Sequence, residues 1–193
     1  MNTLHTDTLT DFHSSARDVF EKIDATQLEN TVSLILKAEK IYVLGTGHSG
    51  MIGRILSMKL NHVGLRAYTV FDEINPPFGQ KDLFIAISQS GETKTIIALA
   101  QKAKKLGGKV LGITSVEDSA LGNIADFLLC IEKHGRFTEF KALGVIGDIH
   151  NQNLLGALFG FNIYVLFYTI IIMLARAKNE TPDSINTRHA NLQ

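Results

Sequence analysis

Short apolar runs alternate with longer amphipathic segments along most of this chain. Residues 41–44 form one such run, continuously apolar and followed by glycine, as is typical of a strand buried on both faces. Four further runs lie at 67–71, 83–87, 110–113 and 127–131. Apolar residues at helical spacing lie between most of the runs, at 51–63, 94–106 and 121–125. This alternation predicts an α/β fold, a three-layer α-β-α sandwich around a mainly parallel, doubly wound sheet of the Rossmann or flavodoxin kind.

Helical segments also flank this central alternation on both sides. Apolar residues recur at helical spacing over 9–23 and 27–37, before the first strand. Near the C-terminus, Thr181 and Pro182 match the cap and the first position of a short helix. The 193 residues predict a single domain, divided into N-terminal helices 1–38, a sheet core 39–132, a loop 133–152, and a long apolar helix with the C-terminal tail 153–193.

The segment 154–175 carries no charge and is long enough to cross a bilayer. Gly156, Gly160 and Asn162 interrupt its apolar character, and the rest of the chain predicts an α/β domain. We therefore interpret it as a core or subunit-interface helix and expect no membrane insertion. Its apolar surface exceeds what one small sheet can cover, so a homo-oligomer, a dimer or a tetramer, is expected.

Composition narrows the classes of partner and the compartment. Nineteen basic and nineteen acidic residues cancel, which argues against broad nucleic-acid binding. The first residues lack the basic and apolar regions of a secretion signal, and a single cysteine, Cys130, excludes an internal disulfide. Both features agree with a cytoplasmic protein. The seven histidines show no spacing typical of a metal-ligand pair, so no metal site is expected.

Two turns rich in glycine and serine carry the candidate chemistry. Residues 45–50, Gly-Thr-Gly-His-Ser-Gly, follow the first predicted strand, and residues 88–93, Ser-Gln-Ser-Gly-Glu-Thr, follow the third. Each turn opens a helix at the carboxyl end of a strand, where unpaired N–H groups and the helix dipole favour a phosphate. The predicted binding residues are Gly45, Gly47, His48, Ser49, Ser88, Gln89, Ser90 and Thr93.

Two other interpretations of these turns remain open. Residues 45–50 also match the Gly-x-Gly-x-x-Gly fingerprint of dinucleotide binding, and Asp72 lies about 20 residues further on, as that fingerprint expects. Alternatively, both turns are only tight connections with helix caps. A sugar phosphate is favoured because a dinucleotide fold has no need of the second turn. Outside the turns, His62 is interpreted as structural and Ser119 as a helix cap.

The two turns together resemble those of the SIS (sugar isomerase) domain family. The segments 107–115 and 118–122 extend the resemblance, and the ending Arg-His-Ala-Asn-Leu at 188–192 is similar to that of the 6-phospho-3-hexuloisomerase group. This resemblance spans nearly the whole chain. It implies a five-stranded parallel sheet, a tetramer and a phosphorylated sugar as ligand. It also implies an isomerisation that moves a carbonyl between C3 and C2 of a ketohexose 6-phosphate, through a cis-enediol and without metal or organic cofactor.

The chain departs from the family it resembles at two positions that bear on catalysis. His48 stands where members of the family usually have arginine, so a titratable group replaces a fixed charge. Gly160 stands where they carry a glutamate that is a leading candidate for the catalytic base. The remaining candidate catalytic residues are His189, supplied by its own or a neighbouring subunit, with Asp72 or Glu73 assisting.

These departures leave three hypotheses about activity. The chain is a hexuloisomerase that uses His189, a sugar-phosphate-binding or regulatory protein that has lost isomerase activity, or an isomerase of another phosphosugar such as an arabinose 5-phosphate. Restoring the carboxylate with Gly160→Glu is expected to separate the first two, because a degraded enzyme would gain activity.

Overall fold

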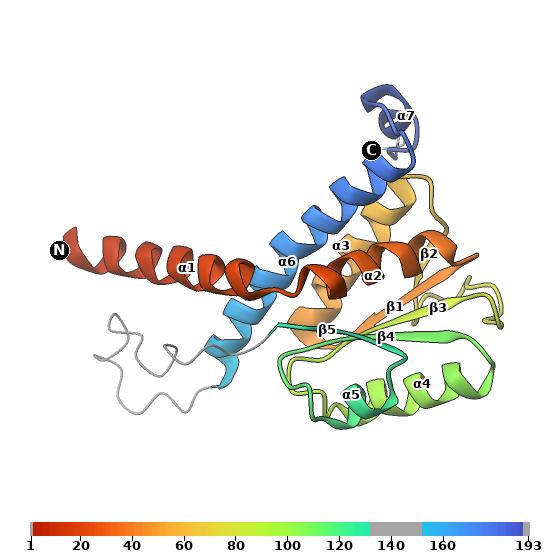
Figure 1. Cartoon of the computed structure of the whole chain (residues 1–193), viewed down its shortest axis with the longest axis horizontal. Helices are drawn as coiled ribbons and strands as arrows, with labels where there is room; N and C mark the ends of the chain where they lie inside the picture. The colour runs from red at the N-terminus through yellow and green to blue at the C-terminus, as the bar shows by residue number, and fades with distance from the viewer. Residues whose placement is uncertain (1, 132–151, 191–193) are drawn as a thin grey trace.

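The computed structural model describes residues 2–131 and 152–190 (Figure 1). Its strands are β1 (Ile41–Gly45), β2 (Ala67–Thr69), β3 (Leu83–Ile87), β4 (Lys109–Thr114) and β5 (Phe127–Cys130). Its helices are α1 (Asn2–Lys22), α2 (Ala25–Lys37), α3 (Gly47–His62), α4 (Lys94–Lys105), α5 (Ala120–Ile124), α6 (Gln152–Ala177) and α7 (Pro182–Asn186). The five strands pair in parallel in the order β2-β1-β3-β4-β5, which confirms the predicted α/β fold.

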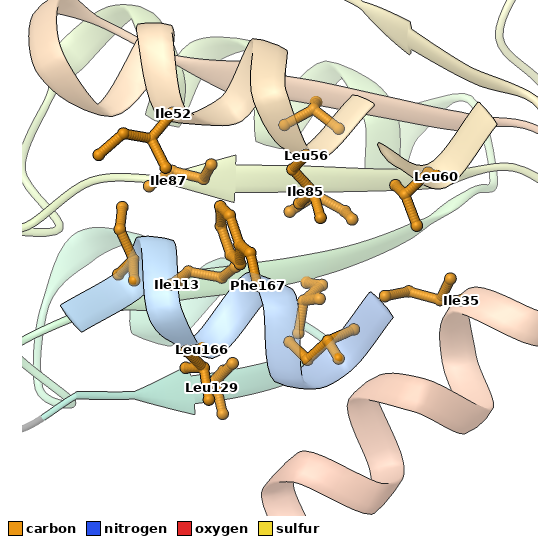
Figure 2. Close-up of a cluster of buried hydrophobic side chains, with 14 of the residues drawn as sticks. Ile35, Ile52, Leu56, Leu60, Ile85, Ile87, Ile113, Leu129, Leu166 and Phe167 are labelled. Carbon is orange, nitrogen blue, oxygen red and sulfur yellow. The ribbon is translucent and has the colours of Figure 1, made fainter. Parts of the chain in front are cut away.

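Helices cover both faces of the sheet, and alternation along the strands assigns side chains to the two layers. In β1, Ile41 and Val43 face the layer that contains α2, α3 and α6, while Tyr42 and Leu44 face α4 and α5. Figure 2 shows the larger cluster, in which side chains of α3 and α6 pack on the strand residues. Its labelled members are Ile35, Ile52, Leu56, Leu60, Ile85, Ile87, Ile113, Leu129, Leu166 and Phe167.

Helix α6 packs as a core helix. Ile163, Leu166, Phe167, Ile170 and Leu174 are buried in the cluster shared with α3 and the sheet. Each such side chain contributes on the order of 1.5–3 kcal/mol of hydrophobic stabilisation. Within the described residues, Phe159–Ala177 is the one stretch with the length and hydropathy of a membrane span, and half of it is buried inside the protein. That burial fits the predicted core or interface helix.

The bounds of several elements differ from those that apolar spacing predicts, most of all in α1, which begins at Asn2 and not near residue 9. The helix expected from residue 51 begins at Gly47, because the glycine and serine residues that open α3 carry no apolar pattern. The strand expected over 67–71 ends at Thr69, whose carbonyl accepts a hydrogen bond from the Asp72 amide in a turn. The predicted loop 133–152 lies, except for its last residue, outside the described residues.

Candidate functional site

The two glycine/serine turns lie side by side at the carboxyl edge of the sheet. Gly45, at the end of β1, pairs in register with Ile87, at the end of β3. The chain leaves β1 toward β2 on one side and returns to β3 on the other, so the topology reverses between these strands. Open parallel sheets bind ligands in the crevice at this switch point. The fold therefore brings the first and second turns to one location.

Helices α3 and α4 begin without side-chain caps. Asp24, Ser119 and Thr181 cap α2, α5 and α7 by accepting hydrogen bonds from first-turn amides. The corresponding residues of α3 and α4, Thr46 and Thr93, make no such bond. First-turn N–H groups need a partner, and among the helices whose N-cap residues are described, the two without a side-chain cap are those whose starts lie side by side. This arrangement suits an anion such as phosphate.

The glycines of the first turn allow a close approach of two backbone segments. A β-carbon built at Gly45 would lie 2.6 Å from the carbonyl of Ser49, and one at Gly50 would lie 2.8 Å from the carbonyl oxygen of Gly45. The end of β1 therefore packs directly on the first turn of α3. Gly47 differs, because it has a φ of +55° and nothing lies within 4 Å of its notional β-carbon. Its backbone faces open space that a ligand can enter.

The second turn is held by hydrogen bonds between its own hydroxyl groups. Ser88 is buried, and its hydroxyl shares a hydrogen bond of 2.9 Å with that of Thr93. Ser90 is exposed and accepts from the Glu92 amide at 3.2 Å. The carbonyl of Gln89 accepts from the Ser115 amide at 3.0 Å. Ser90 therefore presents its hydroxyl at the surface, while Ser88 and Thr93 hold the turn closed.

Glu92 and Ser119 join the second turn to α5. The Glu92 carboxylate accepts a hydrogen bond from the Ala120 amide at 2.8 Å. Ser119 caps α5 and packs against Gly91, whose φ of +69° and close contact with the serine side chain require glycine. These contacts confirm Ser119 as a helix cap and give Glu92 a structural role.

Asp72 lies just beyond the end of β2. It pairs with Arg54 of α3 at 3.0 Å and accepts a hydrogen bond from the Thr69 hydroxyl. Glu73 beside it is exposed. Sequence reasoning missed Arg54, although it stands one helical turn after Gly50 and therefore near the first turn of α3. A catalytic role for Asp72 would therefore also involve Arg54, its ion-pair partner.

His189 lies at the opposite end of α3 from the two turns. Its ring is exposed and stacks on that of His62, with centroids 3.9 Å apart. Since α3 rises 1.5 Å per residue, His62 is about 20 Å from Ser49 along the helix. Within one chain, the structure therefore separates His189 from the other predicted site residues.

Arg188 anchors the tail that carries His189. Its guanidinium donates to the carbonyl of His62 at 3.1 Å and pairs with Glu180 at 2.7 Å. It also lies against Gly64, which has a φ of +71°. The Glu180 carboxylate accepts hydrogen bonds from Arg188 and Ser184, and these lower its pKa. The tail is thus docked on α3 of its own chain, and His189 is exposed.

His62 is a buried structural histidine, as predicted. Burial lowers its pKa from the ordinary value of 6.5, and the neighbouring His189 and Lys59 lower it further. No described residue forms a hydrogen bond with its Nδ1 atom.

The low pKa of His62 predicts a loss of stability in mild acid. Below pH 6.5 the unfolded chain protonates His62 more readily than the folded protein does, so the free energy of unfolding falls as the pH drops. We expect the melting temperature to fall less between pH 7.5 and 5.5 in His62→Phe, which keeps the ring stacking, than in the parent protein. Thermal unfolding at both pH values measures this, and equal falls would contradict it.

His48 reaches across from the start of α3 to α6. A β-carbon built at Gly160 would overlap its imidazole ring, 2.5 Å from Nδ1. His48 is exposed, whereas Gly160 is buried. The two positions at which the sequence departs from the SIS pattern are therefore in contact, although they lie far apart in the chain.

These features define a doubly wound parallel α/β domain with two uncapped helix starts at its switch point. The family model for the SIS domain matches residues 34–140, more than half of the chain. The chain belongs to the SIS domain family, and this confirms the resemblance seen in the two turns. By family it stands with the phosphosugar isomerases, which disfavours the dinucleotide interpretation.

Individual relatives agree with this membership over nearly the whole chain. The 3-hexulose-6-phosphate isomerase of Bacillus subtilis is 32% identical over 189 residues, with 96% of this chain and 95% of that protein covered. A Methanococcus jannaschii crystal structure, from which the molecular function of 3-hexulose-6-phosphate isomerase was inferred, is 26% identical. Its TM-score is 0.80, with 96% of this chain and 99% of that protein covered. An Escherichia coli protein, whose structure was solved in complex with a ligand, is 20% identical to this chain. Its TM-score is 0.75, with 98% of this chain and 100% of that protein covered, and at this identity the likeness supports the fold alone.

Proposed function

We propose that this chain isomerises 3-hexulose 6-phosphate to the 2-ketose by moving the carbonyl from C3 to C2. The observation that carries the proposal is the pair of uncapped helix starts at adjacent strand ends, which suits the phosphate of the substrate. The named Bacillus subtilis relative, which matches almost end to end, supports a ketohexose 6-phosphate over other phosphosugars.

The proposed reaction consists of proton transfers alone. A base removes the proton from C2, the electron pair forms the C2–C3 double bond of an enediol, and a proton is returned to C3. A second group moves the hydroxyl protons between the two oxygens. No electron leaves the sugar, so the reaction needs no redox cofactor. Two acid–base groups are therefore required near a phosphate held by the two turns.

We assign one of these groups to His189 of a neighbouring subunit in a cytoplasmic homo-oligomer. Its exposed ring lies too far from the turns of its own chain to act there. Phe161, Tyr164 and Ile172 leave partly exposed apolar side chains on α6, which suits an interface between copies of the chain. Such an interface would bring the docked tail of one subunit to the turns of another.

A second candidate function is sugar-phosphate binding without turnover. It is favoured by Gly160, which lacks the carboxylate that the SIS resemblance implies at this position. An isomerase of a different phosphosugar, such as an arabinose 5-phosphate, is the further alternative. Both alternatives keep the phosphate site and differ in the chemistry.

Two measurements on the purified protein test the proposal. We expect fructose 6-phosphate, but neither fructose nor NAD, to raise the melting temperature, because a ligand that binds the folded state stabilises it. We also expect conversion of 3-hexulose 6-phosphate to fructose 6-phosphate in a coupled assay. Stabilisation without turnover would support the binding protein, turnover of arabinose 5-phosphate alone would support the other isomerase, and stabilisation by NAD alone would reject the phosphosugar site.

A further inference from the structure

The imidazole of His48 packs directly against the backbone of Gly160. The imidazole occupies the volume into which any side chain at position 160 would project, and its Nδ1 lies 2.5 Å from the notional β-carbon. Glycine is therefore required at 160 for His48 to take this position. Because the ring is exposed, a larger residue at 160 would swing it away without unfolding the domain. Gly160 thus sets the direction of the His48 side chain.

His48 also lies within the proposed phosphate site. It is the second residue of α3, in the helix turn whose amides lack a side-chain cap. The two turns contain one other titratable side chain, Glu92, and its carboxylate is bonded to the Ala120 amide of α5. His48 is the other acid–base group of these turns, and it is exposed. C2 and C3 of a hexose 6-phosphate are only a few bonds from the phosphate-bearing carbon, so a phosphate bound at this turn would bring both carbons near the imidazole.

We propose that His48 is the residue that transfers the carbon-bound proton and that Gly160 positions it. The neutral imidazole takes the proton from C2, and the electron pair left behind forms the C2–C3 double bond while the C3 carbonyl oxygen becomes an enediol oxygen. The imidazolium then returns the proton to C3 as the C2 carbonyl forms. An imidazole accepts and releases a proton near neutral pH, as both steps require. The second group, His189 of a neighbouring subunit, moves the hydroxyl protons between the two oxygens.

The two departures from the SIS pattern then constitute one coupled change. This alters the expectation for Gly160→Glu made from sequence. The glutamate side chain would displace the His48 ring, so the single substitution is expected to lower activity. Combined with His48→Arg, it is expected to be less harmful than the sum of the two single changes, because residues in contact are energetically coupled.

The test compares four variants and rests on the proposed function, since it needs a turnover assay. We expect His48→Asn to lower kcat about 100-fold or more with KM within a few-fold. Exchange of solvent deuterium into C3 of fructose 6-phosphate should be lost with it. Gly160→Ala, which keeps the histidine but displaces it, should likewise lower kcat and abolish the deuterium exchange. Added imidazole should restore activity to His48→Gly. His13→Asn on α1 is the matched control, because it makes the same change at an exposed histidine far from the turns.

Each outcome bears on a different claim. Retained kcat and deuterium exchange in His48→Asn, with a raised KM, would make His48 a phosphate ligand and overturn this inference while the proposed function stands. Unchanged activity in Gly160→Ala would overturn the positioning role. Neither turnover nor exchange in the parent protein would instead reject the proposed isomerase, and the role of His48 with it. Melting temperatures and fructose 6-phosphate stabilisation of all variants report whether the fold and the binding site persist.

Discussion

Replacing Gly45 by alanine is expected to abolish phosphosugar binding while the rest of the domain still folds. The added methyl carbon would lie 2.6 Å from the Ser49 carbonyl group and 2.8 Å from the Gly50 amide nitrogen. Both contacts are to backbone, which cannot rotate away as a side chain can. The end of β1 and the first turn of α3 must separate, and overpacking of this kind costs about 1–3 kcal/mol of stability. The first turn of α3 then no longer holds its place beside the start of α4.

Gly53→Ala is the matched control for this prediction. It adds the same methyl group to the same helix, but the contacts are at 3.2 Å to the ends of the Ile87 and Val43 side chains, which can adjust. Urea unfolding should show the larger loss of stability for Gly45→Ala, and fructose 6-phosphate should raise the melting temperature of the Gly53 variant alone. Equal stabilisation of both variants by the ligand would show that the close packing at Gly45 does not shape the phosphate site.

Mixing two inactive variants is expected to restore isomerase activity. His189→Ala removes the acid–base group from the tail and should lower kcat about 100-fold or more. Ser49→Glu places a negative charge in the first turn of α3, where the helix dipole favours it but a phosphate is repelled. If His189 acts on a neighbouring subunit, a mixed oligomer contains one complete site. It combines the intact turns of the first variant with the intact tail of the second.

Co-expression with two different affinity tags isolates the mixed oligomers and measures this effect. In dimers, the isolated mixed pairs should show about half of the parent activity, since each has one complete site of two. The mixture of Ser49→Glu with Gly45→Ala is the control and should remain inactive, because both changes damage the same turns. If the first mixture also remains inactive, His189 does not act across subunits.

Much of the fold follows from local sequence pattern. The five strands are buried on both faces, so their apolar runs stand out, and all five were predicted within two residues at each end. The crossover helices and the Thr181 cap of α7 were likewise predicted, because capping and periodicity are short-range effects. The start of α3 was missed because its first turn is made of glycine, histidine and serine, which have no apolar period.

The location of the two glycine/serine turns was predictable. Parallel strands share a carboxyl edge, so turns after β1 and β3 must lie there together once the sheet is recognised. The lack of side-chain caps on α3 and α4 could not be predicted, since Thr46 and Thr93 are residue types that often cap helices. Their side-chain directions depend on the surrounding turn, which the amino-acid types alone do not specify.

The sequence by itself determined the order of strands and helices, the place of the two glycine/serine turns and the SIS membership, because each depends on residues close together in the chain. The tertiary structure alone decided two contacts between distant segments. It placed His189 on His62, at the far end of α3 from the turns, and it placed His48 in the space left by Gly160. Such contacts depend on how α3, α6 and the tail pack in three dimensions. They also changed the meaning of Gly160, which as a sequence position marks a missing carboxylate and in the structure makes room for an imidazole.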